Sequence, residues 1–289
     1  MTVRLSAAAK RARLRAVLNG DACVSPASVF DALSARVADS VGYQLGMLGG
    51  SVASAAALAA PDLTVLTLTE LAALVRTICR NSDLALFVDA DHGYGNALSV
   101  RRTIEELEHA GAAGLSIEDT LLPARFGVTG DELLSVDEMS GKLRAAVEAR
   151  QDASFVIAGR TGALAREGLA ATVERVKRYA DAGVDAIFLA GLTSIDEIVA
   201  VRAVISLPII CGNAPDSLDR AGLASHGARI LLQGHQPQVI VIETLRLVYQ
   251  HLHGGGAPRD LATRMPAGNF MNEIIQGPAY RAFRKDYLG

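Results

Sequence analysis

The feature that most constrains the fold is a short pattern that recurs along the chain. A glycine follows a helix-like segment, and an apolar run of strand length comes a few residues later. Glycine suits the left-handed conformation that ends a helix, and an apolar run without alternation suits a strand buried on both faces of a parallel sheet. The pattern occurs as VGYQLGMLGG (41–50), AGAAGLSIED (110–119), AGVDAIFLAG (182–191) and HGARILLQGH (226–235). It therefore predicts a repeating βα unit.

The number of such units points to a closed barrel. Strands are predicted near 27–31, 44–49, 84–89, 113–118, 154–159, 185–190, 207–211 and 228–233. Helical patterns fall at 68–80, 97–110, 137–150, 168–181, 194–204 and 236–252. Eight strands alternating with helices favour a (β/α)8 TIM-type barrel over an open doubly wound sheet. No GxGxxG or GxxxxGK[ST] motif follows the first strand, as an open nucleotide-binding sheet usually requires.

The character of the chain changes after the last predicted strand. We expect a barrel domain with an N-terminal helix over residues 1–252, and a helical extension over 253–289 that packs on the barrel or on a partner. The helix at 238–252 is apolar on more than one face, whereas an outer barrel helix needs only one buried stripe. The excess predicts that these C-terminal helices extend to a neighbouring subunit.

Composition excludes several classes of function. The 289 residues carry a formal charge of −3, with 28 basic and 31 acidic side chains and no long run of one sign, so neither nucleic-acid nor membrane binding is expected. No apolar stretch approaches the roughly 18 residues of a membrane-spanning helix or resembles a signal peptide. Cys23, Cys79 and Cys211 lie far apart and form no CxxC pair. We therefore expect a cytoplasmic protein without disulfide bonds.

Carboxylates follow the predicted strands, at the end of a barrel where active sites lie. Asp89 and Asp91 come at the end of strand three, Glu118 ends strand four, and Asp62 lies in the loop after strand two. Converging carboxylates raise each other's pKa unless a cation is present, and an all-oxygen set favours Mg²⁺, or Mn²⁺, over zinc. Because Mg²⁺ keeps several waters, we expect Asp89 to bind it directly and Asp91 and Glu118 to hold its waters. The alternative is a solvated acidic loop, or a helix N-cap, in which Asp91 and Asn96 would cap the helix that starts near residue 97.

Two cationic or titratable side chains end other strands. Arg160 follows the apolar run SFVIAG (154–159), where a buried strand rarely ends in arginine unless it binds an anion. It is a candidate clamp for a substrate carboxylate, and the alternative is a salt bridge to one of the acidic residues. His235 ends the last strand and is a candidate catalytic residue, although a lone histidine is also common as a satisfied core or capping residue.

A glycine-rich stretch follows strand two. The segment LGGSVAS (48–54) presents backbone N–H groups at a strand end, from Gly49, Gly50 and Ser51. Such a loop can hold a carboxylate or phosphate. Gly-Gly-Ser is also common in ordinary turns, so both interpretations stay open.

Four stretches together resemble a known superfamily. PDLTVLTLTE (61–70), VDADHGYGN (88–96), IEDTLLPARFG (117–127) and IAGRTGAL (157–164) resemble, in order, the motifs of the isocitrate lyase/phosphoenolpyruvate mutase superfamily. The resemblance covers roughly residues 20–250. It implies a (β/α)8 barrel with a helix exchanged between subunits, usually in homotetramers built as dimers of dimers. It also implies Mg²⁺ that binds a 2-oxo acid or its enolate. The metal roles implied are Asp89 as direct ligand, with Asp62, Asp91 and Glu118 acting through water.

One loop distinguishes members of this superfamily. The carbon–carbon lyases carry a Lys-Lys/Arg-Cys-Gly-His stretch soon after the IED motif, whose cysteine serves as acid or base. Here the loop reads LLPARFG (121–127), and the lysine and asparagine typical of mutases and phosphonate hydrolases are also missing. The sequence looks most like the oxaloacetate decarboxylase branch. That resemblance implies Mg²⁺-dependent conversion of oxaloacetate to pyruvate and CO₂, with Ser51, Arg160 and His235 contacting the 2-oxo dicarboxylate.

The chain departs from the family pattern at two positions. Gly162 follows Thr161 where the family usually has Asp or Asn, and Cys211 stands where the decarboxylase branch has an aromatic hydroxyl. Other functions therefore stay open. They are a different carbon–carbon lyase, such as one resembling methylisocitrate lyase, an enzyme of phosphonate chemistry, and a catalytically weak barrel that binds a small dicarboxylate or serves in assembly.

Overall fold

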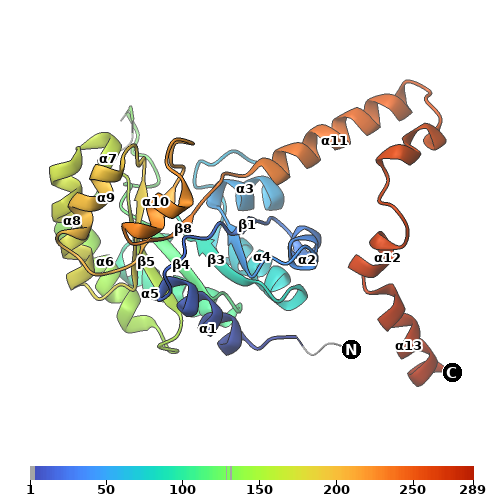
Figure 1. Cartoon of the computed structure of the whole chain (residues 1–289), viewed down its shortest axis with the longest axis horizontal. Helices are drawn as coiled ribbons and strands as arrows, with labels where there is room; N and C mark the ends of the chain where they lie inside the picture. Colours follow the sequence, from blue (N-terminus) through green and yellow to red (C-terminus); the bar gives the residue numbers. More distant parts are fainter. Residues whose placement is uncertain (1–3, 128, 131) are drawn as a thin grey trace.

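The computed structural model describes residues 4–127, 129–130 and 132–289, and these form a (β/α)8 TIM-type barrel (Figure 1). Eight parallel strands pair in sequence order. They are β1 (Ala27–Ser28), β2 (Leu45–Leu48), β3 (Ala85–Asp89), β4 (Gly114–Glu118), β5 (Val156–Thr161), β6 (Ala186–Ala190), β7 (Ile209–Gly212) and β8 (Ala228–Leu231). The predicted fold class is confirmed.

The sheet closes through the residues just before β1. The Val24 N–H donates to the Arg229 carbonyl at 3.0 Å, and the Leu231 N–H donates to the Val24 carbonyl at 3.0 Å. The first strand is shorter than predicted, because the chain turns into a helix at Asp31. The Asp31 carboxylate accepts from the Ser34 N–H at 2.6 Å, and the Ser34 hydroxyl accepts from the Asp31 N–H at 3.0 Å. This reciprocal cap fixes the start of the following helix.

Helices follow the strands around the ring. They are α2 (Ala32–Ser40), α3 (Gly50–Leu58), α4 (Leu68–Asn81), α5 (Ala97–His109), α6 (Val136–Ala149), α7 (Ala163–Arg166), α8 (Leu169–Asp181), α9 (Ile195–Arg202) and α10 (Arg220–Ser225). Side-chain caps at Thr67, Asn96 and Ser135 begin α4, α5 and α6, so these boundaries match the prediction closely. The short helices α2, α3, α7 and α10 were not predicted.

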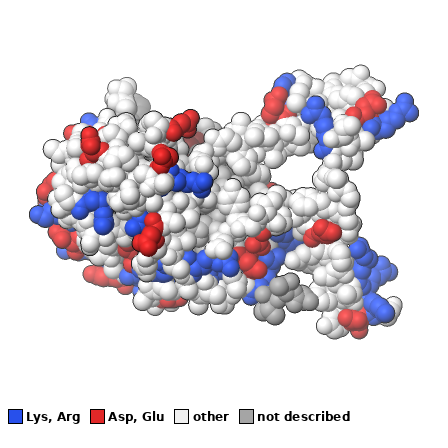
Figure 2. Space-filling model, in the orientation of Figure 1, with Lys and Arg blue, Asp and Glu red and all other residues white. Residues whose placement is uncertain are grey.

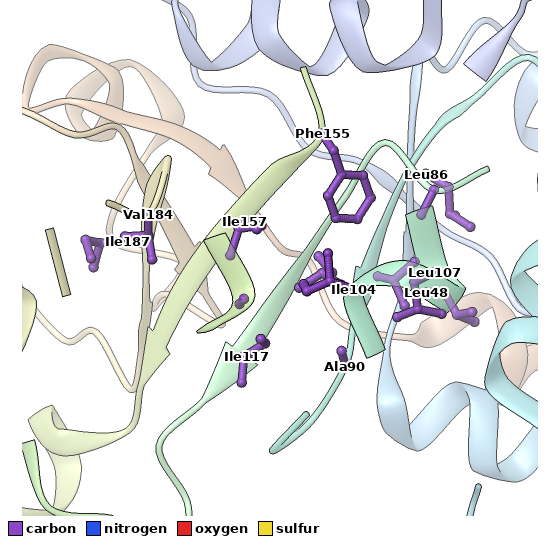
Figure 3. Packing of buried hydrophobic residues seen from close by; sticks show 14 of the residues in the cluster. Leu48, Leu86, Ala90, Ile104, Leu107, Ile117, Phe155, Ile157, Val184 and Ile187 are labelled. Carbon is purple, nitrogen blue, oxygen red and sulfur yellow. The ribbon is translucent and has the colours of Figure 1, made fainter. Parts of the chain in front are cut away.

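Alternation along the strands creates two layers of core. Phe87 of β3 belongs to an inner cluster drawn from the strands, whereas its neighbours Leu86 and Val88 pack outward. Figure 3 shows part of the outer layer, in which Ile104 and Leu107 of α5 belong to the same buried cluster as Leu86 of β3. Side chains of this inner cluster thus fill the barrel interior.

The helix α1 (Ala7–Leu18) covers the N-terminal end of the barrel. Its Leu14 and Leu18 join the inner cluster. Its basic side chains bind carbonyls at that end: the Lys10 ammonium donates to Cys79 O at 2.7 Å, and the Arg11 guanidinium donates to Glu108 O at 2.8 Å. Both carbonyls lie at helix C-termini, which lack partners within their own helix. This end is therefore sealed, and a site must lie at the opposite, carboxyl end of the strands.

The helix α11 (Gln236–His253) leaves the barrel and runs out into solvent (Figure 1). None of its residues is buried. Beyond it lie the 3₁₀ helix η1 (Pro258–Arg264), α12 (Phe270–Ile274) and α13 (Gly277–Leu288). The Arg36 guanidinium of α2 donates to the Ile274 carbonyl at 2.9 Å, so α12 touches the barrel of its own chain. The division into domains at residue 252 stays a prediction.

Candidate active site

Two acidic residues and an arginine meet at the ends of three neighbouring strands. Asp89 ends β3, Glu118 ends β4, and Arg160 lies opposite Glu118 in β5. The Arg160 guanidinium forms salt bridges with Asp89 at 2.5 Å and with Glu118 at 3.1 Å. It also lies over the Phe188 ring, 5.1 Å from its centroid. The salt bridge that was the alternative role for Arg160 is thus present in the structure. Arg160 also lines two open cavities.

The turn after β3 aims Asp91 toward this group. Asp91 and Tyr94 have positive φ angles of 47° and 60°, which non-glycine residues rarely adopt. The turn is held from outside: the buried Lys142 ammonium donates to the His92 carbonyl at 2.6 Å, and the Thr103 hydroxyl donates to the Gly93 carbonyl at 2.9 Å. Asn96, and not Asp91, caps α5. The helix-cap alternative for Asp91 is therefore wrong.

The carboxylates share a strongly negative environment. Burial, together with the charges of Asp89, Asp62 and Glu118, raises the pKa of Asp91 to about 8, although Arg160 acts in the opposite direction. Burial also raises the pKa of Glu118 and of Asp62. Since Arg160 brings a single positive charge to these four acids, they retain an excess of negative charge for a cation to balance.

The His235 side chain is held between Ser28 and Gly49. Its Nδ1 lies 2.7 Å from the Ser28 hydroxyl at the end of β1. A Cβ on Gly49 would lie 2.6 Å from Nε2, so only glycine leaves room for the imidazole. His235 precedes α11 without capping it through its side chain, and burial lowers its pKa. The ring is thus neutral near pH 7. Sequence reasoning missed Ser28, whose only signal is a polar residue at the end of strand one.

The glycine-rich stretch is the start of a helix and not a loop. Gly49 occupies the N-cap of α3, and Gly50 and Ser51 form its first turn. A Cβ on Gly50 would lie 2.1 Å from Asp91 Oδ1. The two glycines therefore admit the side chains of Asp91 and His235. The N-terminal N–H groups of α3, which have no partner within the helix, still lie at the site.

Two cavities meet at the Asp89–Arg160 pair. The larger has a volume of about 410 Å³ and is also lined by Asp62, Asp91 and Glu118. The smaller has a volume of about 260 Å³. Its lining includes Gly49, Gly50, Ser51, Asp62 and His235. The structure thus brings together every residue proposed from the sequence, while the role of each stays a prediction.

The donor set suits a magnesium ion held mainly through water. Among the residues that the structure describes, no three His, Cys, Asp or Glu side chains converge to form a direct metal cage. Mg²⁺ does not need one, because it keeps several waters and takes one or two carboxylates directly. Oxygen donors and surplus negative charge at Asp62, Asp89, Asp91 and Glu118 are what such an ion requires. The residues therefore fit Mg²⁺.

Two nearby residues have structural roles. Asp119 is fully buried and accepts from the Thr161 hydroxyl at 2.6 Å, the Gly162 N–H at 3.1 Å and the Tyr179 hydroxyl at 2.8 Å. It fixes the end of β5. Cys211 packs in the outer core, and burial raises its thiol pKa to about 12. The departure at position 211 therefore places no reactive thiolate in the cavities.

Comparisons with known proteins agree with this geometry. The family model described as phosphoenolpyruvate phosphomutase matches residues 14–253. A relative from Bradyrhizobium diazoefficiens, named oxaloacetate decarboxylase, is 46% identical over 281 residues, which is 97% of each chain. The solved structure of a phosphonopyruvate hydrolase complex with oxalate and Mg²⁺ is 27% identical, with a TM-score of 0.86 over 97% of this chain and 99% of that one. An oxaloacetate acetylhydrolase in complex with 3,3-difluorooxalacetate is 27% identical, with a TM-score of 0.83 over 98% of each chain.

Proposed function

Because the chain belongs to the phosphoenolpyruvate phosphomutase family, we propose that it is a lyase that decarboxylates oxaloacetate to pyruvate and CO₂ with Mg²⁺. The relative from B. diazoefficiens carries that name at 46% identity over nearly the whole chain. Mn²⁺ is the alternative metal. The solved hydrolase complex with oxalate and Mg²⁺ supports a divalent cation beside a small dicarboxylate in this fold.

One observation favours decarboxylation over carbon–carbon lyase chemistry. The loop 121–127, LLPARFG, contains no Cys, His or Lys, and its Leu122 and Ala124 line the larger cavity. Cleavage of a 2-hydroxy acid needs a group that moves a proton, and the loss of such a group typically costs about 10²–10⁴-fold. Loss of CO₂ from a 2-oxo acid needs only an electron sink at the ketone. Decarboxylation therefore does not require an acid–base side chain in the loop 121–127, whereas cleavage of a 2-hydroxy acid does.

The residues of the site have two further tasks, which are to hold the metal ion and to bind the substrate. Bound Mg²⁺ supplies electrophilic stabilisation of the developing enolate. The carboxylates of Asp89, Asp62, Asp91 and Glu118 hold that ion, directly in the case of Asp89. Arg160 and the start of α3 at Ser51 bind and orient the C1 carboxylate.

His235 faces the reacting carbonyl. When its neutral ring accepts a hydrogen bond from the Ser28 hydroxyl at Nδ1, the proton lies on Nε2, the atom beside Gly49. Nε2 then donates a hydrogen bond to the oxygen on which charge develops.

The assembly we propose is a homotetramer, a dimer of dimers with exchanged α11 helices. An apolar groove of about 570 Å³ lies along α2, and Phe30, Leu33 and Val37 line it. The helix α11 exposes Val239, Ile240, Ile242, Leu245 and Leu252. Figure 2 shows the part of this arm nearest the barrel as largely uncharged surface. The partner's α11 would cover such a groove.

Two other properties bear on the setting of the protein. Among the described residues, no helix is both long and apolar enough to cross a membrane. The three cysteines are free and buried. The cytoplasmic location stays a prediction from the cysteine pattern.

A substrate panel tests the proposed function. Purified protein with Mg²⁺ is assayed against oxaloacetate, isocitrate, methylisocitrate, 2,3-dimethylmalate and phosphonopyruvate, with uncatalysed loss of CO₂ subtracted. We expect pyruvate from oxaloacetate, loss of turnover in EDTA, and at most weak cleavage of the 2-hydroxy acids. His235→Ala is expected to slow turnover more than it weakens Mg²⁺ binding. Faster cleavage of a 2-hydroxy acid would show that the protein is a carbon–carbon lyase with an unidentified base.

A further inference from the structure

Three consecutive carbonyls of the turn after β3 are each held by a different element of the fold. The Asp91 carbonyl accepts from the Glu118 N–H of β4 at 2.8 Å. The His92 carbonyl accepts from the Lys142 ammonium of α6 at 2.6 Å, and the next carbonyl accepts from the Thr103 hydroxyl of α5 at 2.9 Å. The bond from Lys142 is the one of the three in which the donor is a charged side chain, and bonds of that kind are the stronger ones.

The side chains of the turn add little to this hold. His92 Nδ1 and the Tyr94 hydroxyl are buried, and neither has a hydrogen-bond partner in the described part of the chain. The backbone at Asp91 and Tyr94 nevertheless keeps positive φ angles. Such a conformation persists only where its surroundings impose it. The bonds to the carbonyls are therefore what fixes the direction in which Asp91 points.

Lys142 is a buried cation that the proposed reaction does not use. Its residue is 3% exposed and lines neither of the two cavities. Burial lowers its pKa, and the charges of Glu138, Glu118 and Asp119 act in the opposite direction. Among the described residues it takes part in no salt bridge, and its hydrogen bond goes to the His92 carbonyl. Because a buried charge without an ionic partner is costly, this ammonium serves the turn and not an ion pair.

We propose that Lys142 is a positioning residue of the metal site, which holds the His92 carbonyl so that the Asp91 carboxylate stays directed at Mg²⁺ and its waters. This inference rests on the proposed function, because that function supplies the metal. Lys142 contacts neither the ion nor the substrate, and it acts only through the turn.

The direction of the effect on metal binding separates position from charge. A positive charge near Glu118 opposes the binding of another cation. If Lys142 acted only through its charge, its removal would strengthen Mg²⁺ binding. If it positions Asp91, its removal loosens the turn and weakens Mg²⁺ binding.

The test compares Lys142→Met with Lys10→Met by calorimetric titration with Mg²⁺. Lys10 is the matched control, because it is also 3% exposed and its ammonium donates to two carbonyls, but at the sealed end of the barrel. We expect Lys142→Met to weaken Mg²⁺ binding by roughly ten-fold. Lys10→Met should leave it unchanged, although both changes lower the melting temperature. Equal or tighter Mg²⁺ binding in Lys142→Met would overturn the proposal.

Turnover gives a second signature of a positioning role. In Lys142→Met the Mg²⁺ concentration at half-maximal turnover should rise by the same factor, while kcat at saturating Mg²⁺ stays near that of the unmodified protein. Lys142→Gln keeps an N–H donor on a slightly shorter side chain, and should weaken Mg²⁺ binding by roughly three-fold. With Lys10→Gln as control, it provides the same comparison if the methionine variant does not fold.

Hydrogen exchange in the metal-free protein gives a measurement that needs neither metal nor substrate. Amides of residues 90–95 should exchange faster in Lys142→Met and at the original rate in Lys10→Met. Unchanged exchange in Lys142→Met would overturn the proposal. Absence of oxaloacetate turnover in an unmodified protein that binds Mg²⁺ would refute the decarboxylase assignment alone, and weaker Mg²⁺ binding in Lys142→Met would still support the positioning role.

Discussion

Replacing Asp91 with asparagine should make the metal-free protein more stable, although Asp91 belongs to the proposed metal site. In the absence of metal, burial and the charges of Asp89, Asp62 and Glu118 raise its pKa from 3.8 to about 8. The native state therefore holds a proton that the unfolded state has released. Stability contributed by this group is present at low pH and is lost as pH rises from about 4 to about 8.

The size of the effect follows from the same shift. At about 1.4 kcal/mol for each tenfold in proton affinity, the rise from 3.8 to about 8 corresponds to on the order of 5 kcal/mol. Neighbouring carboxyls can take up the proton instead, so we expect a net gain of about 2–3 kcal/mol at pH 8 for Asp91→Asn. For a domain of this size that gain raises the melting temperature by about 5 °C.

The assay is thermal unfolding at pH 5 and pH 8, in EDTA and in excess Mg²⁺. The gain should be largest at pH 8 in EDTA, should shrink at pH 5, and should disappear in Mg²⁺, which stabilises only the carboxylate form. Asp119→Asn is the matched control, because Asp119 is equally buried but accepts three hydrogen bonds. That change should destabilise the protein under every condition. If Asp91→Asn lowers the melting temperature at pH 8 in EDTA, the account of the acidic cluster is refuted.

Three further substitutions test individual contacts. Asp89→Ala should abolish Mg²⁺-dependent turnover while leaving a cooperative unfolding transition, and normal turnover would contradict its role as the direct ligand. Ser28→Ala should lower kcat/KM by roughly ten-fold through the loss of one hydrogen bond to His235, and Ser28→Thr should restore most of it, as steady-state kinetics across pH can show. Leu245→Asp on α11 should yield smaller species in sedimentation at micromolar concentration, whereas Arg246→Ala on the same helix should not.

The sequence predicts the barrel well because each strand can be recognised from a short local pattern of residues. Four of the eight apolar runs follow a glycine, at Gly42, Gly111, Gly183 and Gly227, and the length of each run favours a strand over a helix. The acidic residues were also found in this way, since Asp89 and Glu118 end such runs. Arg160 was found for the same reason, although it lies inside β5 and not beyond it.

The features that could not be predicted from the sequence depend on contacts between residues that are distant in the chain. Ser28 meets His235 across more than two hundred residues, and no local pattern marks such a pair. The helix α3 begins inside a glycine-rich stretch, where propensity favours a turn. Gly50 is there because Asp91 needs the space, which only the folded barrel reveals.

The sealed end of the barrel has a consequence for how the chain folds during synthesis. The helix α1 leaves the ribosome early, yet its inner-facing leucines pack among strands up to β8. Val24, which closes the ring, pairs with Ile230 in that last strand. Loop-closure entropy for such distant partners must be overcome before the contacts form. The helix α1 can contact β3 and β5 earlier, but its packing among the strands is complete only after β8 has emerged. The earliest segment of the barrel is thus among the last to be fully docked, and until then its inner-facing leucines stay partly exposed in the growing chain.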